Sequence, residues 1–198
     1  EAYRLWKTRI GLPESRIYRL GASENFWSMG DTGPRGPCSE IHYELVCGSS
    51  KVDTGKKPDP AYFLEIWNLV FMQFLQQGDG SKIPLPAQNI DTGAGLERWA
   101  MMLQGKASVY DTDIFAPLLD YVAGRCGREY PSAPEAERRA LRVIVEHGRS
   151  MTFLISDGAL PGNEGRGYVL RRLIRRALYM AQTLGIEDQI LPDVAAEV

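Results

Sequence analysis

The sequence is poor in the residues that build metal centres and disulfide frameworks. Its 198 residues include three cysteines and two histidines, and no two cysteines have the C-x-x-C spacing. An odd number of widely spaced cysteines predicts no disulfide framework. The histidines, His42 and His147, are far apart in sequence, so we expect no protein-bound zinc and no other metal site. Reduced thiols, as found in the cytoplasm, are the simplest interpretation of Cys38, Cys47 and Cys126.

Long apolar runs and a large net charge are also absent. No apolar stretch reaches 18 residues, which predicts no transmembrane helix and no membrane partner. The first residues, Glu1–Arg4, do not resemble a signal peptide, and we expect a cytoplasmic protein. The net charge of −2 provides no overall basic field for nucleic acid, so basic residues have to be judged locally.

The hydrophobic fraction of 44% and the charged fraction of 24% are typical of globular proteins, and the length suits one large domain or two small ones. The first part of the chain has mostly strand patterns, with His42 on the polar, exposed phase of one strand. Its expected elements are a helix at 1–12, strands at 16–20, 25–29, 38–46 and 62–75, a short return strand ending near residue 90, and loops at 30–37 and 48–60.

The second part of the chain has only helical periodicity. Apolar residues recur at helical spacing in three segments, 113–125, 135–154 and 167–184, which prolines and glycines separate. We therefore predict an α+β protein with two domains. An antiparallel sheet and one helix occupy 1–105, and an all-helical domain occupies 106–198.

A glycine-containing segment, Asp91-Thr92-Gly93-Ala94-Gly95-Leu96-Glu97-Arg98, leads into a helical pattern. One hypothesis is that Asp91 or Thr92 caps that helix and that Arg98 lies on its solvated face. The other is a ligand site, in which glycines let the backbone approach a nucleotide, Asp91 accepts hydrogen bonds from an ammonium, and Arg98 binds a base or phosphates. The segment alone leaves both open.

The last helical pattern carries arginines opposite an apolar face. Leu170, Leu173, Ile174, Ala177, Leu178 and Ala181 share the apolar face, while the basic residues are Arg166, Arg171, Arg172, Arg175 and Arg176. A solvated amphipathic helix and a stripe that binds RNA phosphates both fit this pattern, and arginine in place of lysine favours RNA. Asn163 precedes the helix, where a cap is its simplest role.

Four segments, at 25–41, 65–74, 91–98 and 163–172, together resemble the alanyl-tRNA synthetase family of class II aminoacyl-tRNA synthetases. Residues 91–98 resemble motif 3 of that class. The resemblance runs in order over nearly the whole chain. It implies part of the class II antiparallel β-sheet core over 1–105, followed by a helical domain over 106–198 that recognises the tRNA acceptor stem.

The resemblance also implies an alanine pocket beside an ATP site. Asp91 would bind the substrate ammonium, Gly93 would limit side-chain size, and Arg98 would pack on adenine. Asp91 and Arg98 are the implied catalytic residues. The implied alanine-binding residues are Trp27, Asn68, Val70, Asp91 and Gly93. ATP, as its Mg²⁺ complex, would contact Gly95, Arg98 and Glu40.

For tRNA, the resemblance implies that Asn163 reads the G·U wobble pair of the tRNA-Ala acceptor stem. The other implied tRNA-binding residues are Arg166, Arg171, Arg172, Arg175, Arg176, His147 and Arg149. The implied activity is alanine–tRNA ligation, in which ATP activates alanine to alanyl-adenylate and the alanyl group passes to tRNA-Ala. The alternative is a non-catalytic tRNA-binding module that uses only the helical part.

Several parts of that family have no counterpart in this sequence. They are motif 1, motif 2 with its phosphate-binding arginine, the editing domain and the C-terminal domain. We therefore expect the chain to be an internal part of an aminoacylation region, with the remainder of the synthetase as its partner. We expect weak or no catalysis from the isolated chain.

Overall fold

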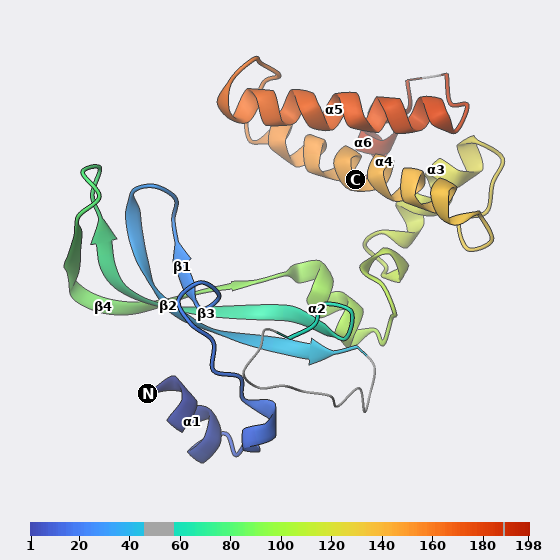
Figure 1. Cartoon of the computed structure of the whole chain (residues 1–198). Helices are drawn as coiled ribbons and strands as arrows, with labels where there is room; N and C mark the ends of the chain where they lie inside the picture. The colour runs from blue at the N-terminus through green and yellow to red at the C-terminus, as the bar shows by residue number, and fades with distance from the viewer. Residues whose placement is uncertain (46–57, 188) are drawn as a thin grey trace. The chain divides into compact units, whose positions relative to one another are not determined.

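The computed structural model describes residues 1–45, 58–187 and 189–198. These residues form two compact units, Glu1–Leu103 and Gln104–Val198. The first unit contains an antiparallel sheet and the second is helical (Figure 1), which confirms the α+β fold class predicted from the sequence. The division lies close to the boundary expected at 105/106.

Some expectations fall on residues outside this description. They concern Cys47 and most of the surface loop expected at 48–60. Within the described part of the chain, Cys38 and Cys126 are free thiols. None of the helices described there is long and apolar enough to cross a membrane.

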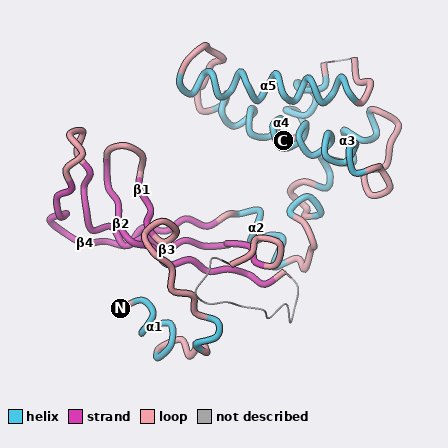
Figure 2. Tube along the Cα trace, viewed as in Figure 1, coloured by secondary structure: helices cyan, strands magenta, loops and turns pink. Residues whose placement is uncertain are grey.

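The first unit is built on a four-stranded sheet in which every neighbouring pair is antiparallel (Figure 2). The strands follow the order of the chain: β1 (Phe26–Ser28), β2 (Gly33–Glu44), β3 (Phe63–Gln76) and β4 (Lys82–Ala94). The expected central strand at 62–75 is therefore confirmed as β3. Helix α2 (Leu96–Leu103) follows β4 and packs on the sheet through Trp99, whose ring lies 5.8 Å from that of Trp67.

Strand β2 contains a bulge where a loop was expected. The loop predicted at 30–37 is confirmed at 30–32 and wrong at 33–37, because β2 begins at Gly33 and its register with β3 shifts between Arg35 and Cys38. A bulge tolerates the glycines and prolines that made this segment resemble a loop. At Gly36 a Cβ atom would lie 1.8 Å from the carbonyl oxygen of Phe71, so only glycine fits this close approach of two backbones.

The N-terminal segment covers the sheet without joining it. Helix α1 (Ala2–Thr8) is shorter than the helix expected at 1–12, and the strand expected at 16–20 is wrong. A 3₁₀ turn, η1 (Glu14–Arg16), and irregular chain stand there instead. Side-chain contacts hold this chain in place: Arg16 pairs with Glu44 at 2.8 Å, and the Tyr18 ring lies 6.3 Å from that of Phe63. Alternation here reflects contact with the sheet, not ladder hydrogen bonds.

Strand β4 continues past the point where its end was expected. The prediction of an end near residue 90 is wrong, because β4 remains paired with β3 as far as Ala94. Asp91 and Gly93 consequently lie in a strand, and α2 begins only at Leu96. The hypothesis that Asp91 or Thr92 caps this helix is therefore wrong. The ladder to β3 outweighs the turn preference of the local glycines.

The described residues of the second unit pack four α-helices around two apolar clusters. They are α3 (Ala116–Arg125), α4 (Glu135–Ser156), α5 (Gly165–Thr183) and α6 (Ile190–Glu197), preceded by a 3₁₀ turn, η2 (Val109–Asp111). The helices predicted at 113–125, 135–154 and 167–184 are confirmed with small shifts at their ends; α6 was not predicted. Fully buried residues include Leu119, Val122, Leu141, Ile144, Val145, Leu170, Ala177, Ile190 and Val194.

A histidine side chain is buried in this helical interior. His147, on α4, is only 9% exposed, and its Nε2 atom has no hydrogen-bond partner in the described structure. Burial lowers the pKa of His147 from its ordinary 6.5; Glu146 opposes this shift and Arg176 adds to it. The folded state therefore holds this imidazole in its neutral form at neutral pH.

The bulge provides a first test. Gly36→Ala should destabilise the first unit by about 1–3 kcal/mol, because the added methyl group meets the backbone of Phe71. All four tryptophans lie in this unit, so thermal unfolding followed by tryptophan fluorescence reports on it alone. Gly78→Ala is the control, since a Cβ there meets nothing within 4 Å. Similar transitions for the two variants would contradict the close approach.

His147 provides a second test, on the helical unit. Its folded pKa is lowered, so the unfolded chain binds the proton more readily and the free energy of unfolding falls as the pH drops through about 6.5. Denaturant unfolding followed by circular dichroism at pH 7 and pH 5 should show a smaller loss for His147→Gln than for the unchanged chain. Equal losses would show that His147 is not held neutral.

Candidate functional site

The centre of β3 brings together residues that the sequence had singled out separately. Asn68 lies directly opposite Glu40 on β2 and opposite Gly93 on β4. Residues that face each other across antiparallel strands lie on the same side of a sheet. Glu40, Asn68 and Gly93 therefore form one row across three strands, which we call the Asn68 row.

A second row lies beside the first. Val70 is opposite Cys38 on β2 and opposite Asp91 on β4. Each member is two residues from a member of the Asn68 row, and side chains two apart in a strand share a face. The two rows therefore place an amide, two carboxylates, a thiol, an isopropyl group and a glycine on one patch of the sheet.

The polar groups of this patch are joined through Glu40. Its carboxylate accepts from His42 Nε2 at 2.9 Å and from Asn68 Nδ2 at 3.4 Å. The Cys38 Sγ atom is 4.0 Å from the same carboxylate. Burial and the negative charge of Glu40 raise the pKa of the Cys38 thiol, so it stays protonated at neutral pH. Cys38 therefore acts here as a small apolar group, not as a nucleophile.

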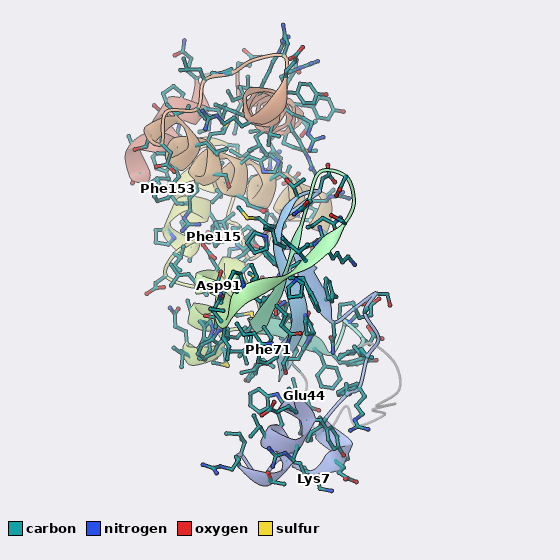
Figure 3. All side chains as sticks on the ribbon, turned by 90° about the vertical axis from the view of Figure 1, so that its left-hand side faces the viewer. Lys7, Glu44, Phe71, Asp91, Phe115 and Phe153 are labelled. Carbon is teal, nitrogen blue, oxygen red and sulfur yellow. The ribbon has the colours of Figure 1, made fainter. Side chains whose placement is uncertain are left out.

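The β4 end of the patch is open. Asp91 is exposed, and its Oδ1 accepts a hydrogen bond from the neighbouring Thr92 amide at 2.9 Å. Figure 3 shows the Asp91 side chain on β4. At Gly93 a Cβ atom would meet nothing within 4 Å, so there is free space directly above the backbone. A carboxylate beside free space suits a cationic ligand.

Arg98 is held at the beginning of β3. Its Nη1 atom donates to the carbonyl oxygen of Glu65 at 2.6 Å and lies 4.0 Å from the Glu65 carboxylate. The Arg98 side chain also packs over Gly95, where a Cβ atom would lie 3.2 Å from its Cδ. The glycine thus makes room for the arginine stem. Within the described residues, no hydrogen bond or ion pair joins Arg98 to Asp91.

Trp27 lies farther from the patch along the sheet. It is on the short strand β1, opposite Gly36, and is 37% exposed. Strand β1 pairs with β2, so β2 separates Trp27 from the β3 residues of the two rows. The strand order does not make Trp27 a direct neighbour of Asn68 or Val70, and its place in the pocket stays a prediction.

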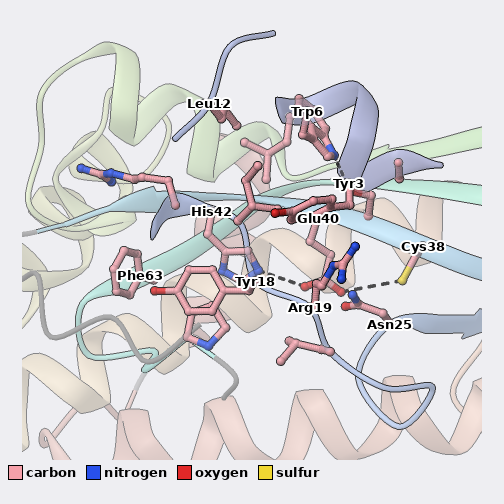
Figure 4. A pocket seen from close by; sticks show the side chains of 17 residues that line it. Tyr3, Trp6, Leu12, Tyr18, Arg19, Asn25, Cys38, Glu40, His42 and Phe63 are labelled. Atoms are coloured by element: carbon pink, nitrogen blue, oxygen red, sulfur yellow. Dashed lines mark hydrogen bonds and ion pairs between the residues drawn. The ribbon is translucent and has the colours of Figure 1, made fainter. Parts of the chain in front are cut away.

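A cavity of about 420 Å³ adjoins the β2 end of the patch (Figure 4). Cys38, Glu40 and His42 line one side, and the N-terminal segment supplies aromatic and basic groups, including Tyr18 and Arg19. The sequence analysis missed this segment as part of a site. It also placed His42 on an exposed phase, which is wrong, because the side chain is 20% exposed and bound to Glu40. The signal available was the i, i+2 spacing of Glu40 and His42.

In the helical unit, the predicted RNA-binding residues divide into exposed and enclosed groups. Those that are exposed are Asn163, Arg166, Arg171, Arg172, Arg175 and Arg176. His147 is buried, and Arg149 lies over the rings of Phe115 and Phe153, at 5.5 Å from each. His147 is therefore not part of the exposed surface formed by the α5 arginines.

Local geometry at the start of α5 differs from the simplest expectation. The N-cap of α5 is Glu164, so the capping role suggested for Asn163 is wrong. The side-chain oxygen of Asn163 instead accepts a hydrogen bond from Arg171. The apolar face of α5 is also narrower than expected, because Leu178 is 44% exposed. Two exposed tyrosines that the sequence analysis did not single out, Tyr168 and Tyr179, lie on this helix among the arginines.

The described residues contain no group of three or more His, Cys, Asp or Glu side chains placed to hold a metal ion. A divalent ion carried by a nucleotide needs less from the protein, since Mg²⁺ bound to phosphates commonly takes only one or two carboxylates. Glu40 and Asp91 are the two carboxylates of the patch. They could contribute to such a complex but could not enclose a metal alone.

Comparison with known proteins agrees with this architecture. A protein-family profile described as tRNA synthetases class II (A) matches residues 1–198. Alanine–tRNA ligases from Anaeromyxobacter sp. (strain Fw109-5), Oleidesulfovibrio alaskensis and Dehalococcoides mccartyi (strain BAV1) are 49%, 51% and 51% identical to the whole chain. The chain spans 23% of the length of each of these relatives. By the extent of the family match and its sheet architecture, the chain belongs to the class II (A) family of tRNA synthetases.

Proposed function

We propose that the protein takes part in alanine–tRNA ligation, activating alanine with ATP to alanyl-adenylate and transferring the alanyl group to tRNA-Ala. The observation that carries this proposal is the patch formed by the two rows. It combines an acidic group, a half-buried amide and an open glycine on one face of the sheet. The relatives that cover the whole chain are named alanine–tRNA ligases, which supports the same assignment.

The amino-acid ammonium would bind between Asp91 and Asn68. An ammonium has three donors and requires acceptors. Asp91 offers an exposed carboxylate, and Asn68 offers a buried Oδ1 atom that has no hydrogen-bond partner in the described structure. The strand register supports placing Asp91 near Asn68. Asp91 lies opposite Val70, and Val70 is two positions from Asn68 on β3, so the side chains share one face.

Side-chain selection would depend on the small residues of the patch. Gly93 leaves space above the backbone, and Val70 and Cys38 give an apolar surface beside it. A methyl group can pack there, and larger side chains are excluded sterically if the rest of the pocket is closed. Rejection of glycine is harder, because one methyl group contributes only about 1–3 kcal/mol.

ATP would bind toward Gly95, Arg98 and Glu40. Guanidinium groups stack on bases and bind phosphate oxygens, and Arg98 is about 46% exposed beside Glu65. Mg²⁺ bound to the phosphates would supply charge neutralisation. The protein's main task in this chemistry is to align the amino-acid carboxylate with the α-phosphate, which needs orientation more than a covalent catalyst.

The exposed side of α5 would bind the acceptor stem. Arg166, Arg172, Arg175 and Arg176 are solvent-exposed on this one helix and would contact phosphates of the RNA backbone. Arg171 holds the side-chain oxygen of Asn163. The Asn163 NH₂ group is then the part of the amide that can donate to a base edge in the shallow minor groove of A-form RNA.

Asp91 provides the test of the alanine pocket. In the protein expressed at full length from its own gene, Asp91→Asn should raise the KM for alanine by about one to two orders of magnitude, because a charged hydrogen bond is lost. Alanine-dependent exchange of pyrophosphate into ATP measures this. Asp79→Asn, in the turn between β3 and β4, is the control and should change little. An unchanged KM and kcat for Asp91→Asn would show that the pocket is elsewhere.

A second candidate function is tRNA binding without catalysis. It is favoured by the compactness of residues 104–198, which form their own apolar core. The two functions differ in one measurement. Alanine-dependent pyrophosphate exchange requires the sheet patch and no RNA, whereas a binding module would retard tRNA in a gel-shift assay and show no exchange.

Asn163 provides the test of the RNA surface. Asn163→Ala should spare adenylate formation and reduce the preference for a G·U over a G·C acceptor stem by about tenfold, the low end for a specific base contact. Charging rates of the two stems measure the preference. Arg175→Ala is the matched control, because Arg175 is exposed on the same helix and loss of a phosphate-binding charge should weaken both stems alike. An unaltered preference in Asn163→Ala would refute a base-reading role.

A further inference from the structure

His42 lies outside the proposed alanine pocket but is connected to it by two hydrogen bonds. Its Nε2 atom is 2.9 Å from Glu40 Oε2, and Glu40 Oε1 is 3.4 Å from Asn68 Nδ2. The side chains of His42 and Glu40 are 20% and 19% exposed, so water competes weakly for these groups. The two oxygens of one carboxylate are thus shared between an imidazole and an amide (Figure 4 shows the first contact).

The chemistry of the carboxylate determines the direction of both hydrogen bonds. An ionised carboxylate can only accept, so His42 Nε2 carries a proton and Asn68 presents its NH₂ group to Glu40. The Asn68 Oδ1 atom is then turned to the other side. It is inaccessible to water and has no hydrogen-bond partner in the described structure. A buried acceptor without a donor is costly, which indicates a place for a donor from a ligand.

We propose that His42 is a positioning residue: through Glu40 it fixes the amide of Asn68 so that Oδ1 accepts a hydrogen bond from the ammonium group of the amino-acid substrate. This inference rests on the proposed function. His42 does not touch the substrate. It holds the Glu40 carboxylate in the rotamer that keeps the Asn68 NH₂ group occupied.

The weaker of the two hydrogen bonds, between Glu40 and Asn68, explains why His42 matters. At 3.4 Å, the contact between Glu40 and Asn68 is near the outer limit of a hydrogen bond. A carboxylate released from His42 can rotate toward the adjoining cavity, which Glu40 also lines. The Asn68 amide is then free to flip and to direct its NH₂ group at the ammonium. Two hydrogen-bond donors that face each other repel, so the affinity for the amino-acid substrate falls.

The test compares two substitutions of His42 in the full-length protein expressed from its own gene. His42→Phe keeps a ring and removes the donor, and it should raise the KM for alanine in pyrophosphate exchange by about tenfold, as for one hydrogen bond to a charged group. The kcat should change little, and the KM for ATP should rise less than that for alanine, because Glu40 is the one proposed ATP contact that this substitution releases, while Arg98 stays bound to Glu65. His42→Gln retains an Nε2 donor of similar reach and should restore most of the alanine affinity.

Tyr43→Phe is the matched control, because Tyr43 is the next residue on β2 and is more exposed. Thermal unfolding of each variant identifies a general loss of structure. If His42→Phe does not fold, His42→Ala takes its place in the comparison with His42→Gln.

Four outcomes would overturn the inference. An alanine KM unchanged in His42→Phe shows that His42 does not act on the pocket. Equal defects in His42→Phe and His42→Gln, or equal rises in the KM values for alanine and ATP, show a merely structural role. If the unsubstituted protein itself lacks alanine-dependent exchange, the proposed function fails, and the inference fails with it.

Discussion

The register of β3 against its two neighbours is the constraint on which the candidate site depends. Each of the two rows takes one residue from β2, one from β3 and one from β4. Because side chains alternate between faces, a slip of one residue in either ladder would move one member of each row to the other side of the sheet. The bulge at Gly36 is therefore part of the site's construction, since it sets the register of β2 beyond it.

The elements with strong periodicity could be predicted from the sequence, and those fixed by contacts between strands could not. Strand β3 and helices α4 and α5 carry clear apolar patterns, and they occur where those patterns placed them. The glycine-rich beginning of β2 and the last residues of β4 were mistaken because their local composition favours turns. Pairing along β3 supplies the hydrogen bonds that overcome this preference, and pairing between distant segments leaves no local signal.

The candidate site shows the same division between composition and arrangement. Motifs singled out Asn68, Asp91 and Gly93 one by one, but they did not show that Asn68 and Gly93 are direct neighbours on adjacent strands. They also missed His42, because alternation tells which side of a strand a residue takes and not what covers that side. In α5, periodicity gave the arginines but not the hydrogen bond from Arg171 that turns the Asn163 amide.

The two carboxylates of the patch have a consequence for any amino acid that approaches it. Glu40 and Asp91 lie on the same face of the sheet, in adjacent rows and on opposite outer strands of the three. An amino acid at neutral pH is a zwitterion, with an ammonium group and a carboxylate group attached to the same carbon atom. A negatively charged face attracts the first group and repels the second. In the proposed site, this face would orient a bound amino acid with its carboxylate directed outward, where a second substrate could reach it.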